Sequence, residues 1–355
     1  MDKTIKLLQE LITYDSSHKT VANDTIEYCK TWLEQENLAP QIISNNGFKM
    51  LLCEVGQGEQ TLILNGHVDV VSGKDSQFNP EIKDNRIYGR GSADMKAGVA
   101  AMMGALVELN DARLTNVKVQ LHLMTDEEIG GVNCADYLTT AGHLGDFVIC
   151  AEPTQLGIGI QAKGILQFDL TITGVAAHSS RPWEGTNAIA KSMAIYEQIL
   201  DLPFAQEQSD FYDGPSINLA KISGGDVYNK VPDTCKLSFD IRYLPTQNRA
   251  AIIEQIKGLT DSQLDIHLEG PPVLTNKDNP YIQKLIKTIK THTLEDSVAV
   301  FGQHGFADTR YYARYNVPAI EFGPAGAHWH GDDEYAELAS IEKYQAMLVS
   351  FAQQL

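Results

Sequence analysis

The sequence predicts an α/β protein in which helices flank a mostly parallel sheet and a smaller, ferredoxin-like α+β domain is inserted. Three observations support this prediction. Helical and strand-like segments alternate over residues 1–155, which is typical of a parallel sheet. After Thr154 the order changes to β-α-β-β-α-β, the order of ferredoxin-like domains. The alternation of helix and strand returns over residues 280–355.

The first part of the chain contains the segments expected to build the main sheet. Ile5, Leu8, Leu11 and Ile12 recur at helical spacing with charges between them, which predicts an amphipathic surface helix. Helices are expected at 1–14, 22–36 and 93–110, and strands at 61–66, 116–125 and 146–152. These strands are mostly apolar, so we expect them to be buried.

The middle and the end of the chain complete the predicted topology. In the middle, strands are expected at 164–174, 216–223, 232–243 and 264–269, with helices at 185–200 and 247–259. At the end, helices are expected at 280–292, 307–315 and 340–354, with strands at 297–301 and 318–322. The favoured interpretation is one domain, 1–163 and 275–355, interrupted by a second, 164–274. Two sequential domains followed by a tail are the alternative.

The charge balance limits the classes of partner. The 355 residues include 28 Lys and Arg against 46 Asp and Glu, a formal net charge of -18. This balance argues against binding to nucleic acid or to an anionic membrane surface. The chain contains no apolar run of the ~18 residues that a membrane helix needs, and its start does not resemble a signal peptide. Five scattered cysteines without zinc-site spacing favour a reduced, cytoplasmic protein.

The strongest functional signal is the position of acidic and histidine residues just after apolar strands. The carboxyl ends of strands in an α/β sheet are where ligands bind. Several loops would therefore deliver imidazoles and carboxylates to one edge of the sheet. The residues concerned are His67 and Asp69, Asp94, Asp126 to Glu128, Glu152 and His330.

Each of these residues also has a structural interpretation when taken alone. His67 could be a buried histidine with satisfied hydrogen bonds, and Asp94 could cap the helix that begins near it. Glu127 and Glu128 could be a solvated pair. Glu152 could simply end a strand, and His330 could lie in a surface loop. Convergence of all of them by chance is improbable, and we therefore favour a common site.

Two histidines and three carboxylates form a nitrogen and oxygen ligand set that suits zinc, with cobalt or manganese as substitutes. Five ligands exceed what one tetrahedral ion with an open position needs. They suit two ions that share one carboxylate and a water, as in two-metal aminopeptidase sites. An additional carboxylate beside the ligands would then act as general base. Asp69, two residues after His67, could accept the second ring N–H of that histidine.

The motifs resemble those of the di-zinc amidohydrolases that include succinyl-diaminopimelate desuccinylase, acetylornithine deacetylase, aminoacylase and glutamate carboxypeptidase. The resemblance extends over nearly the whole chain. The matching segments are GHVDVV (66–71), YGRGSADMKAG (88–98), TDEEIGG (125–131), AEPT (151–154), GVAAHSSRPWEGTNAI (174–189), NKVPD (229–233), DIRYLP (240–245) and HGDDEY (330–335). The stretch 72–84 is shorter than in the family, and 305–312 differs from the deacylases named, which leaves the substrate open.

The resemblance implies roles for ten residues. The metal ligands would be His67 and Glu152 for one zinc, Glu128 and His330 for the other, and Asp94 as the bridge between them. Glu127 would be the general base, Asp69 the partner of His67, and His178 the oxyanion-stabilising histidine contributed by a partner subunit. Asn229 and Arg242 would bind the substrate, with Arg242 on its carboxylate. His330 is preferred to His328 because its spacing to Glu334 matches the family.

The resemblance therefore implies an enzyme that hydrolyses the amide bond of an N-acyl amino acid with two zinc ions. It further implies that residues 1–163 and 275–355 form the metal-binding catalytic domain. The inserted domain, 164–274, would act as a lid and form a homodimer. The alternatives are a dipeptidase or carboxypeptidase with the same two metals, and a non-catalytic binding protein that has lost them.

Overall fold

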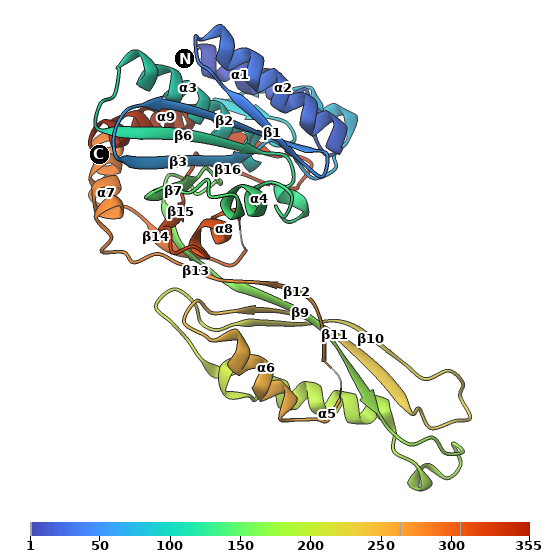
Figure 1. The fold of residues 1–355 in the computed structure, drawn as a ribbon. Helices are drawn as coiled ribbons and strands as arrows, with labels where there is room; N and C mark the ends of the chain where they lie inside the picture. Colours follow the sequence, from blue (N-terminus) through green and yellow to red (C-terminus); the bar gives the residue numbers. More distant parts are fainter. Residues whose placement is uncertain (1, 263, 306) are drawn as a thin grey trace. The chain divides into compact units, whose positions relative to one another are not determined.

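The computed structural model describes residues 2–262, 264–305 and 307–355. Within it, residue contacts divide the chain into two units (Figure 1). The first unit consists of Met1–Ile160, Thr275–Phe301 and Ala307–Leu355. The second consists of Gln161–Leu274 and Gly302–Phe306. The first unit is therefore assembled from segments that precede and follow the main segment of the second unit in the sequence.

The first unit is built on a mixed sheet whose centre is parallel. Its strands run in the order β1-β2-β6-β3-β7-β15-β8, and β14 also pairs with β8. The four central strands, β6, β3, β7 and β15, are parallel, and the outer pairs are antiparallel. The strands are β1 (Gln41–Asn45), β2 (Phe48–Gly56), β3 (Gln60–His67), β6 (Val117–Met124), β7 (Phe147–Cys150), β8 (Ile158–Ala162), β14 (Val300–Gln303) and β15 (Ala319–Glu321).

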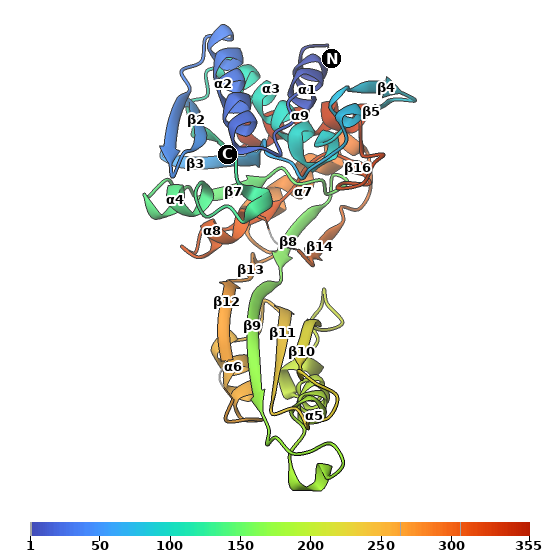
Figure 2. The ribbon, with the colours of Figure 1, turned by 90° about the vertical axis from the view of Figure 1, so that its right-hand side faces the viewer.

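Helices cover both faces of this sheet (Figures 1 and 2). On one face, Gly66 of β3 lies against Val99 and Met102 of α3 so closely that a Cβ would collide with them. On the other face, Ile63 packs in a cluster with Tyr312 of α8. The helices are α1 (Asp2–Ile12), α2 (Lys19–Gln35), α3 (Ala97–Asp111), α4 (Ala135–Thr140), α7 (Pro280–Thr293), α8 (Thr309–Ala313) and α9 (Leu338–Gln353).

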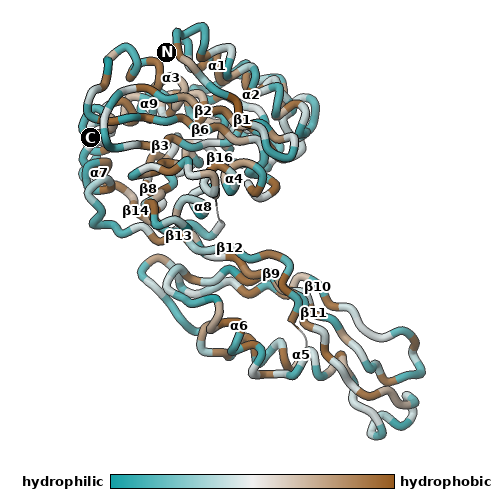
Figure 3. The backbone as a smooth tube through the Cα atoms, viewed as in Figure 1, coloured by the Kyte–Doolittle hydropathy of each residue, from teal (hydrophilic) through white to brown (hydrophobic). Residues whose placement is uncertain are grey.

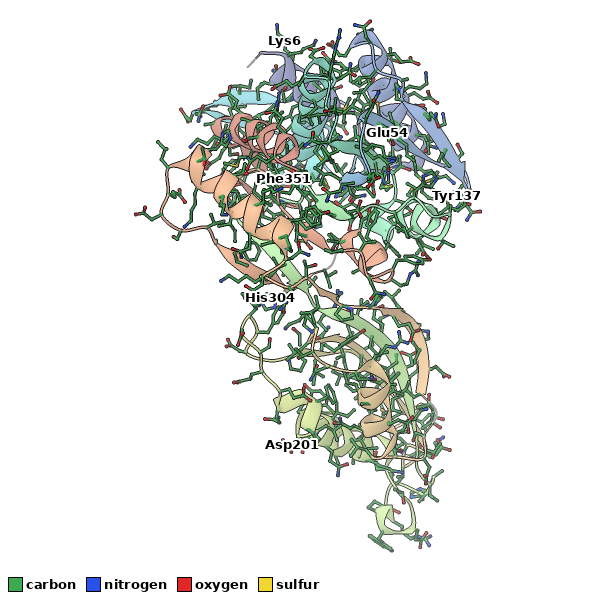
Figure 4. The ribbon with its side chains drawn as sticks, turned by 60° about the vertical axis from the view of Figure 1, so that its left-hand side comes forward. Lys6, Glu54, Tyr137, Asp201, His304 and Phe351 are labelled. Carbon is green, nitrogen blue, oxygen red and sulfur yellow. The ribbon has the colours of Figure 1, made fainter. Side chains whose placement is uncertain are left out.

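A small antiparallel sheet and a buried aromatic cluster complete the first unit. The small sheet has the order β16-β17-β5-β4. Its strands are β4 (Glu81–Lys83), β5 (Arg86–Tyr88), β16 (Gly326–Ala327) and β17 (Tyr335–Glu337). In Figure 4, Phe351 of α9 lies among packed side chains, and its ring centre is 6.0 Å from that of Phe147. The labelled Lys6 and Glu54 lie on the surface.

The second unit has the ferredoxin-like order β9-α5-β10-β11-α6-β12 with an antiparallel sheet ordered β10-β11-β9-β12. The helices begin after Asn187 and Asn248, whose side chains accept backbone N–H groups of the first turn, as N-caps do. The elements are β9 (Gly164–Thr173), α5 (Ala188–Leu200), β10 (Ser216–Gly224), β11 (Thr234–Tyr243), α6 (Arg249–Lys257), β12 (Leu264–Gly270) and the short β13 (Val273–Leu274).

Strict alternation gives the sheet of the second unit one apolar and one polar face. Leu166, Phe168 and Leu170 of β9 belong to a buried cluster with residues of α5 and α6. The cross-strand pair Phe168 and Phe239 stacks at 5.1 Å between ring centres. The intervening residues, such as Asp169, lie on the opposite, polar face. Figure 3 shows the same alternation as brown and teal segments along these strands.

The structure confirms the predicted fold class, with helices on both faces of a largely parallel sheet and a separate ferredoxin-like module. The antiparallel extension by β1 and β2 was not predicted. The predicted helix 93–110 starts later, at Ala97, because residues 92–96 form an irregular turn with non-helical dihedral angles at Asp94. Among the described residues, no helix is both long and apolar enough to cross a membrane.

Asp169, on the polar face of the second unit, is predicted to stabilise the folded protein through its charge. Burial would raise the pKa of this carboxyl, but hydrogen bonds from Lys236, Ser238 and His267 hold the pKa below its usual value. A lowered folded-state pKa stabilises the protein above the unfolded pKa of ~3.9, and this contribution disappears as the pH falls further. Asp169→Asn should therefore reduce the free energy of unfolding by ~1–3 kcal/mol at pH 7.

Urea unfolding at pH 7 and at decreasing pH would measure this difference. The difference between Asp169→Asn and wild type should shrink in acid. Glu197→Gln, at an exposed site on α5, provides a control with the same change of charge and should match wild type at both pH values. A difference that stays constant with pH would contradict the assigned role of the Asp169 charge.

Candidate metal centre

Most of the acidic and histidine residues predicted from the sequence lie at the carboxyl ends of the central parallel strands β3, β6 and β7. His67 is the last residue of β3, and Glu152 follows the end of β7 by two residues. Glu127 and Glu128 form a short 3-10 turn after β6. His330 lies between β16 and β17 of the small sheet, and Asp94 lies in the irregular turn that follows β5. Parallel neighbours end at the same edge of a sheet, so the loops after β3, β6 and β7 meet there and the small sheet contributes the other two residues.

The first ligand group consists of His67, Asp94 and Glu152. The Nε2 atom of His67 lies 3.3 Å from Oδ1 of Asp94 and 3.9 Å from Oε1 of Glu152. The His67 side chain is 1% exposed. Its Nε2 atom nevertheless makes no well-formed hydrogen bond with any described residue. A buried ring nitrogen that faces two carboxylates without a hydrogen bond fits a metal ligand.

The second ligand group consists of Asp94, Glu128 and His330. The Nε2 atom of His330 lies 3.3 Å from Oδ2 of Asp94 and 3.3 Å from Oε1 of Glu128. The two oxygens of Asp94 therefore face different histidines, as a carboxylate that bridges two ions requires. The His330 side chain is 52% exposed, so this side of the centre is open to solvent.

The pKa shifts reveal an excess of negative charge at the centre. Burial raises the pKa of Glu127 and Glu152 well above their usual values, and neighbouring carboxylates raise them further. Burial disfavours the charged form of His67, but the close carboxylates raise its pKa well above the usual value. Burial opposes the charge of Asp94 too, yet contacts with both histidines lower its pKa. Divalent cations would neutralise this excess.

Asp69 contacts His67 in a different way from that expected. The Nδ1 atom of His67 lies 2.9 Å from the main-chain oxygen of Asp69 and 3.6 Å from the carboxylate oxygen Oδ1. A carbonyl oxygen can only accept, so Nδ1 donates its hydrogen, and the lone pair of the neutral ring lies on Nε2. The other carboxylate oxygen of Asp69 accepts the backbone N–H of Glu128 at 3.0 Å. Asp69 therefore connects the β3 end to the turn of Glu127 and Glu128.

Glu127 lies beside both ligand groups without belonging to either. Its Oε2 atom is 3.8 Å from Nε2 of His67, and its side chain is 15% exposed. The turn that follows it is unusually close to α8. Gly131 has φ +66°, and a Cβ there would lie 2.4 Å from Oδ1 of Asp308. Glycine at this position thus permits both the backbone conformation and the close approach.

Two alternatives left open by the sequence do not describe the molecule. Asp94 is not the N-cap of α3, because Lys96 occupies that position and the helix begins at Ala97. His328 is in neither ligand group; its Nδ1 atom instead lies 2.7 Å from a carboxylate oxygen of Asp333. The geometry therefore favours His330 over His328 as the ligand candidate.

The remaining three predicted residues lie in the second unit. His178 and Asn229 are neighbours, because the segment after β9 pairs with the loop between β10 and β11. His178 forms a bridge with Lys230, and the N–H of Ser179 donates to the main-chain oxygen of Asn229 at 3.1 Å. Arg242, on β11, donates from Nε to Oδ1 of Asp240 at 2.8 Å. Two of the three are thus brought together, and Arg242 lies on the polar face of the sheet.

Three buried charged residues that border the centre had no role predicted from the sequence. Arg90 and Glu334 form a buried ion pair at 2.7 Å between Nη1 and Oε2. Burial, together with the nearby Asp126, raises the pKa of Asp308 to about 7. A signal existed for the first two, because both lie inside segments that match the family motifs. Their pairing across 244 positions of the chain could not be deduced from either motif alone.

The chain is similar to proteins of known sequence and structure. A family model described as Peptidase family M20/M25/M40 matches residues 63–354. A probable succinyl-diaminopimelate desuccinylase of Staphylococcus aureus is 28% identical over 96% of this chain and 94% of its own length. Aminopeptidase PepT of Bacillus cereus aligns with a TM-score of 0.85 at 17% identity, covering 99% of this chain and 98% of its own. The YXEP protein of Bacillus subtilis, described as a dinuclear metal binding peptidase, aligns with a TM-score of 0.75 at 14% identity, covering 99% and 97%.

Proposed function

The chain belongs to peptidase family M20/M25/M40, and from this premise we propose that it is a two-metal hydrolase that cleaves the amide bond of N-acyl amino acids. The observation that carries the proposal is the pair of ligand groups that share Asp94, with Glu127 beside them. The relative named as a probable desuccinylase, similar over nearly its whole length, supports a deacylase.

The donor set fits two zinc ions, with cobalt or manganese as substitutes. We propose that His67 and Glu152 hold one ion, Glu128 and His330 the other, and Asp94 both. The buried His67 Nε2 and Glu128 Oε1 atoms, which have no well-formed hydrogen bond with described residues, support this assignment. When bound, the two ions would polarise the amide carbonyl and lower the pKa of water.

Glu127 would move the proton in this reaction. It accepts a proton from the attacking water and returns it to the nitrogen of the leaving amine. A group with this double task needs a pKa closer to neutrality than that of an exposed glutamate. Burial raises the pKa of Glu127, whereas nearby cations would lower it again, so the two effects oppose each other at this position.

The second unit would supply the remaining contacts. We propose that Arg242 and Asn229 bind the free carboxylate of the substrate, since the Arg fork matches a carboxylate. His178 would stabilise the oxyanion in the site of a partner subunit. The unit has two edge strands, β10 and β12, and edge strands can pair with a second copy. The proposed assembly is therefore a homodimer that forms through residues 165–274.

The cysteines support a cytoplasmic location for this enzyme. All five are buried and free in the structure. Buried thiols without disulfides are typical of proteins in a reducing compartment. Burial raises the pKa of Cys29 to about 12 and that of Cys53 to about 11, so these thiols remain protonated and unreactive near neutral pH.

A peptidase that cleaves dipeptides or C-terminal residues is the second candidate. The structural similarity to proteins named as an aminopeptidase and as a dinuclear metal binding peptidase supports cleavage of a peptide bond. The metal centre would be the same, because peptide and N-acyl bonds are both amides. The two candidates differ in the group on the acyl side of the bond.

A substrate screen with controlled metal content tests the proposal. N-succinyl and N-acetyl amino acids should be hydrolysed with a higher kcat/KM than dipeptides. Chelation should abolish the hydrolysis because the carbonyl would lose its polarising ions, and added zinc or cobalt should restore it. Preferred cleavage of dipeptides would favour the second candidate. Full activity of the chelated protein would contradict a two-metal mechanism.

Glu127 and its neighbour Glu128 provide a matched pair of variants. Glu127→Gln keeps the side-chain shape but removes the base, so kcat should fall by ~10²-fold or more while the metal content stays at the wild-type level. Glu128→Gln makes the same chemical change in a ligand and should lower the metal content. Elemental analysis and steady-state kinetics measure both effects. Loss of metal from Glu127→Gln but not from Glu128→Gln would mean that the two roles are reversed.

Mixing two inactive variants tests the role of His178 in a partner subunit. His178→Ala should lower kcat by ~10²–10³-fold, the usual effect of losing one oxyanion donor. A heterodimer of His178→Ala with Glu127→Gln contains one site with both the base and the histidine intact. Activity should therefore reappear once the two variants have been mixed at equal concentration and their subunits have exchanged. Heterodimers that form and stay inactive would disprove the assignment.

A further inference from the structure

We propose that Glu334, together with Arg90, is a positioning residue. The pair holds the turn that carries Asp94 and the loop that carries His330 at a fixed separation. At this separation, Asp94, Glu128 and His330 can bind the same ion. The inference rests on the proposed two-metal function. It concerns residues that touch neither the substrate nor an ion. Glu334 directly precedes β17, and Arg90 lies between β5 and the turn that carries Asp94.

Both carboxylate oxygens of Glu334 are occupied by donors from the Asp94 turn. Oε1 accepts the backbone N–H groups of Ala93 at 2.9 Å and of Asp94 itself at 3.1 Å. Oε2 accepts the backbone N–H of Gly91 at 3.0 Å and Nη1 of Arg90 at 2.7 Å. Four donors from five consecutive residues thus converge on one side chain. The irregular backbone of this turn is held by Glu334 in place of the regular hydrogen bonds of a helix.

Arg90 extends the same connection to the second loop. Its Nη2 atom donates to the main-chain oxygen of His330 at 3.2 Å and to that of Ser72 at 3.3 Å. His330 has φ +63°, a left-handed conformation that a non-glycine residue adopts only where its surroundings hold it. The contact between Arg90 and the His330 carbonyl is one such restraint. The network therefore ends on the backbones of two proposed ligands, Asp94 and His330.

The position of the pair distinguishes it from an ordinary surface ion pair. The side chains of Arg90 and Glu334 are 4% and 1% exposed, so solvent does not compete for their hydrogen bonds. On the same loop, Asp332 pairs with Lys74, but that side chain is 69% exposed. A surface pair of this kind constrains a loop weakly. Asp332→Asn therefore removes one carboxylate from the same loop and serves as a matched control.

Glutamine is the informative substitution at Glu334 because each of its two carboxylate oxygens accepts from two donors. An amide has one accepting and one donating end. In Glu334→Gln, either the pair Ala93 and Asp94 or the pair Gly91 and Arg90 must face an NH₂ group. The variant keeps the volume of the side chain and loses two of the four hydrogen bonds to the Asp94 turn. Partners that orient metal ligands typically contribute ~10–100-fold to metal affinity.

The experiment is a cobalt titration of the metal-free full-length protein. Visible absorption of bound Co²⁺ monitors the titration, and elemental analysis counts the bound ions. Wild type and Asp332→Asn should each take up two ions per chain. Glu334→Gln should keep one ion and bind the second ~10–100-fold more weakly, with a circular dichroism spectrum like that of wild type. A purely structural role would lower the melting temperature of the metal-free protein without changing the second binding constant.

Each outcome is decisive for one of the two proposals. Wild type that fails to bind two ions refutes the two-metal function itself. Wild type with two ions and Glu334→Gln with unchanged affinity for both refutes the positioning role alone. If Glu334→Gln does not fold, Arg90→Gln combined with Glu334→Gln removes both buried charges and is titrated instead. Unchanged second-ion affinity in this double variant, or failure of it to fold, overturns the inference.

Discussion

The constraint on which the first unit depends is the concentration of buried carboxylates at the end of its parallel strands. Five acidic side chains, of Asp69, Asp94, Glu127, Glu128 and Glu152, lie around two imidazoles. Burial opposes every one of these charges. The arrangement persists because the parallel register of β6, β3 and β7 fixes where each loop begins. Helices on both faces leave the strand ends as the position at which a cation can enter.

Much of this centre could be predicted because its members follow local patterns. His67, Glu127 and Glu152 each come directly after an apolar run, and parallel strands bring such positions to one edge. The antiparallel strands β1 and β2 escaped prediction because polar residues interrupt their alternation, although the tight Asn46-Gly47 turn that joins them is a typical hairpin signal. The contact of His67 with the main-chain oxygen of Asp69, instead of its carboxylate, depends on the turn geometry, which residue types do not specify.

Pairings between distant segments were the least predictable part of the site. Arg90 and Glu334 look like ordinary polar residues of two loops, and only the folded chain brings them together. Charged side chains are rarely buried unless paired, yet a sequence does not reveal which are buried. The same limitation applies to Arg242. In the structure its Nε edge is used by Asp240, so a substrate carboxylate would have to bind another part of the guanidinium or displace Asp240.

A net charge of -18 would on average repel the anionic N-acyl amino acid that we propose as the substrate, but the field at the site is set locally. Charges farther away than the Debye length, ~8 Å at physiological ionic strength, are largely screened. Within that distance, five carboxylates and two divalent cations would nearly cancel, and the cations would be the largest single charges. Loading with metal would therefore change the site from one that repels a carboxylate into one that tolerates it. The acidity of the rest of the surface would then serve solubility, and selection among anionic substrates would depend on residues such as Arg242.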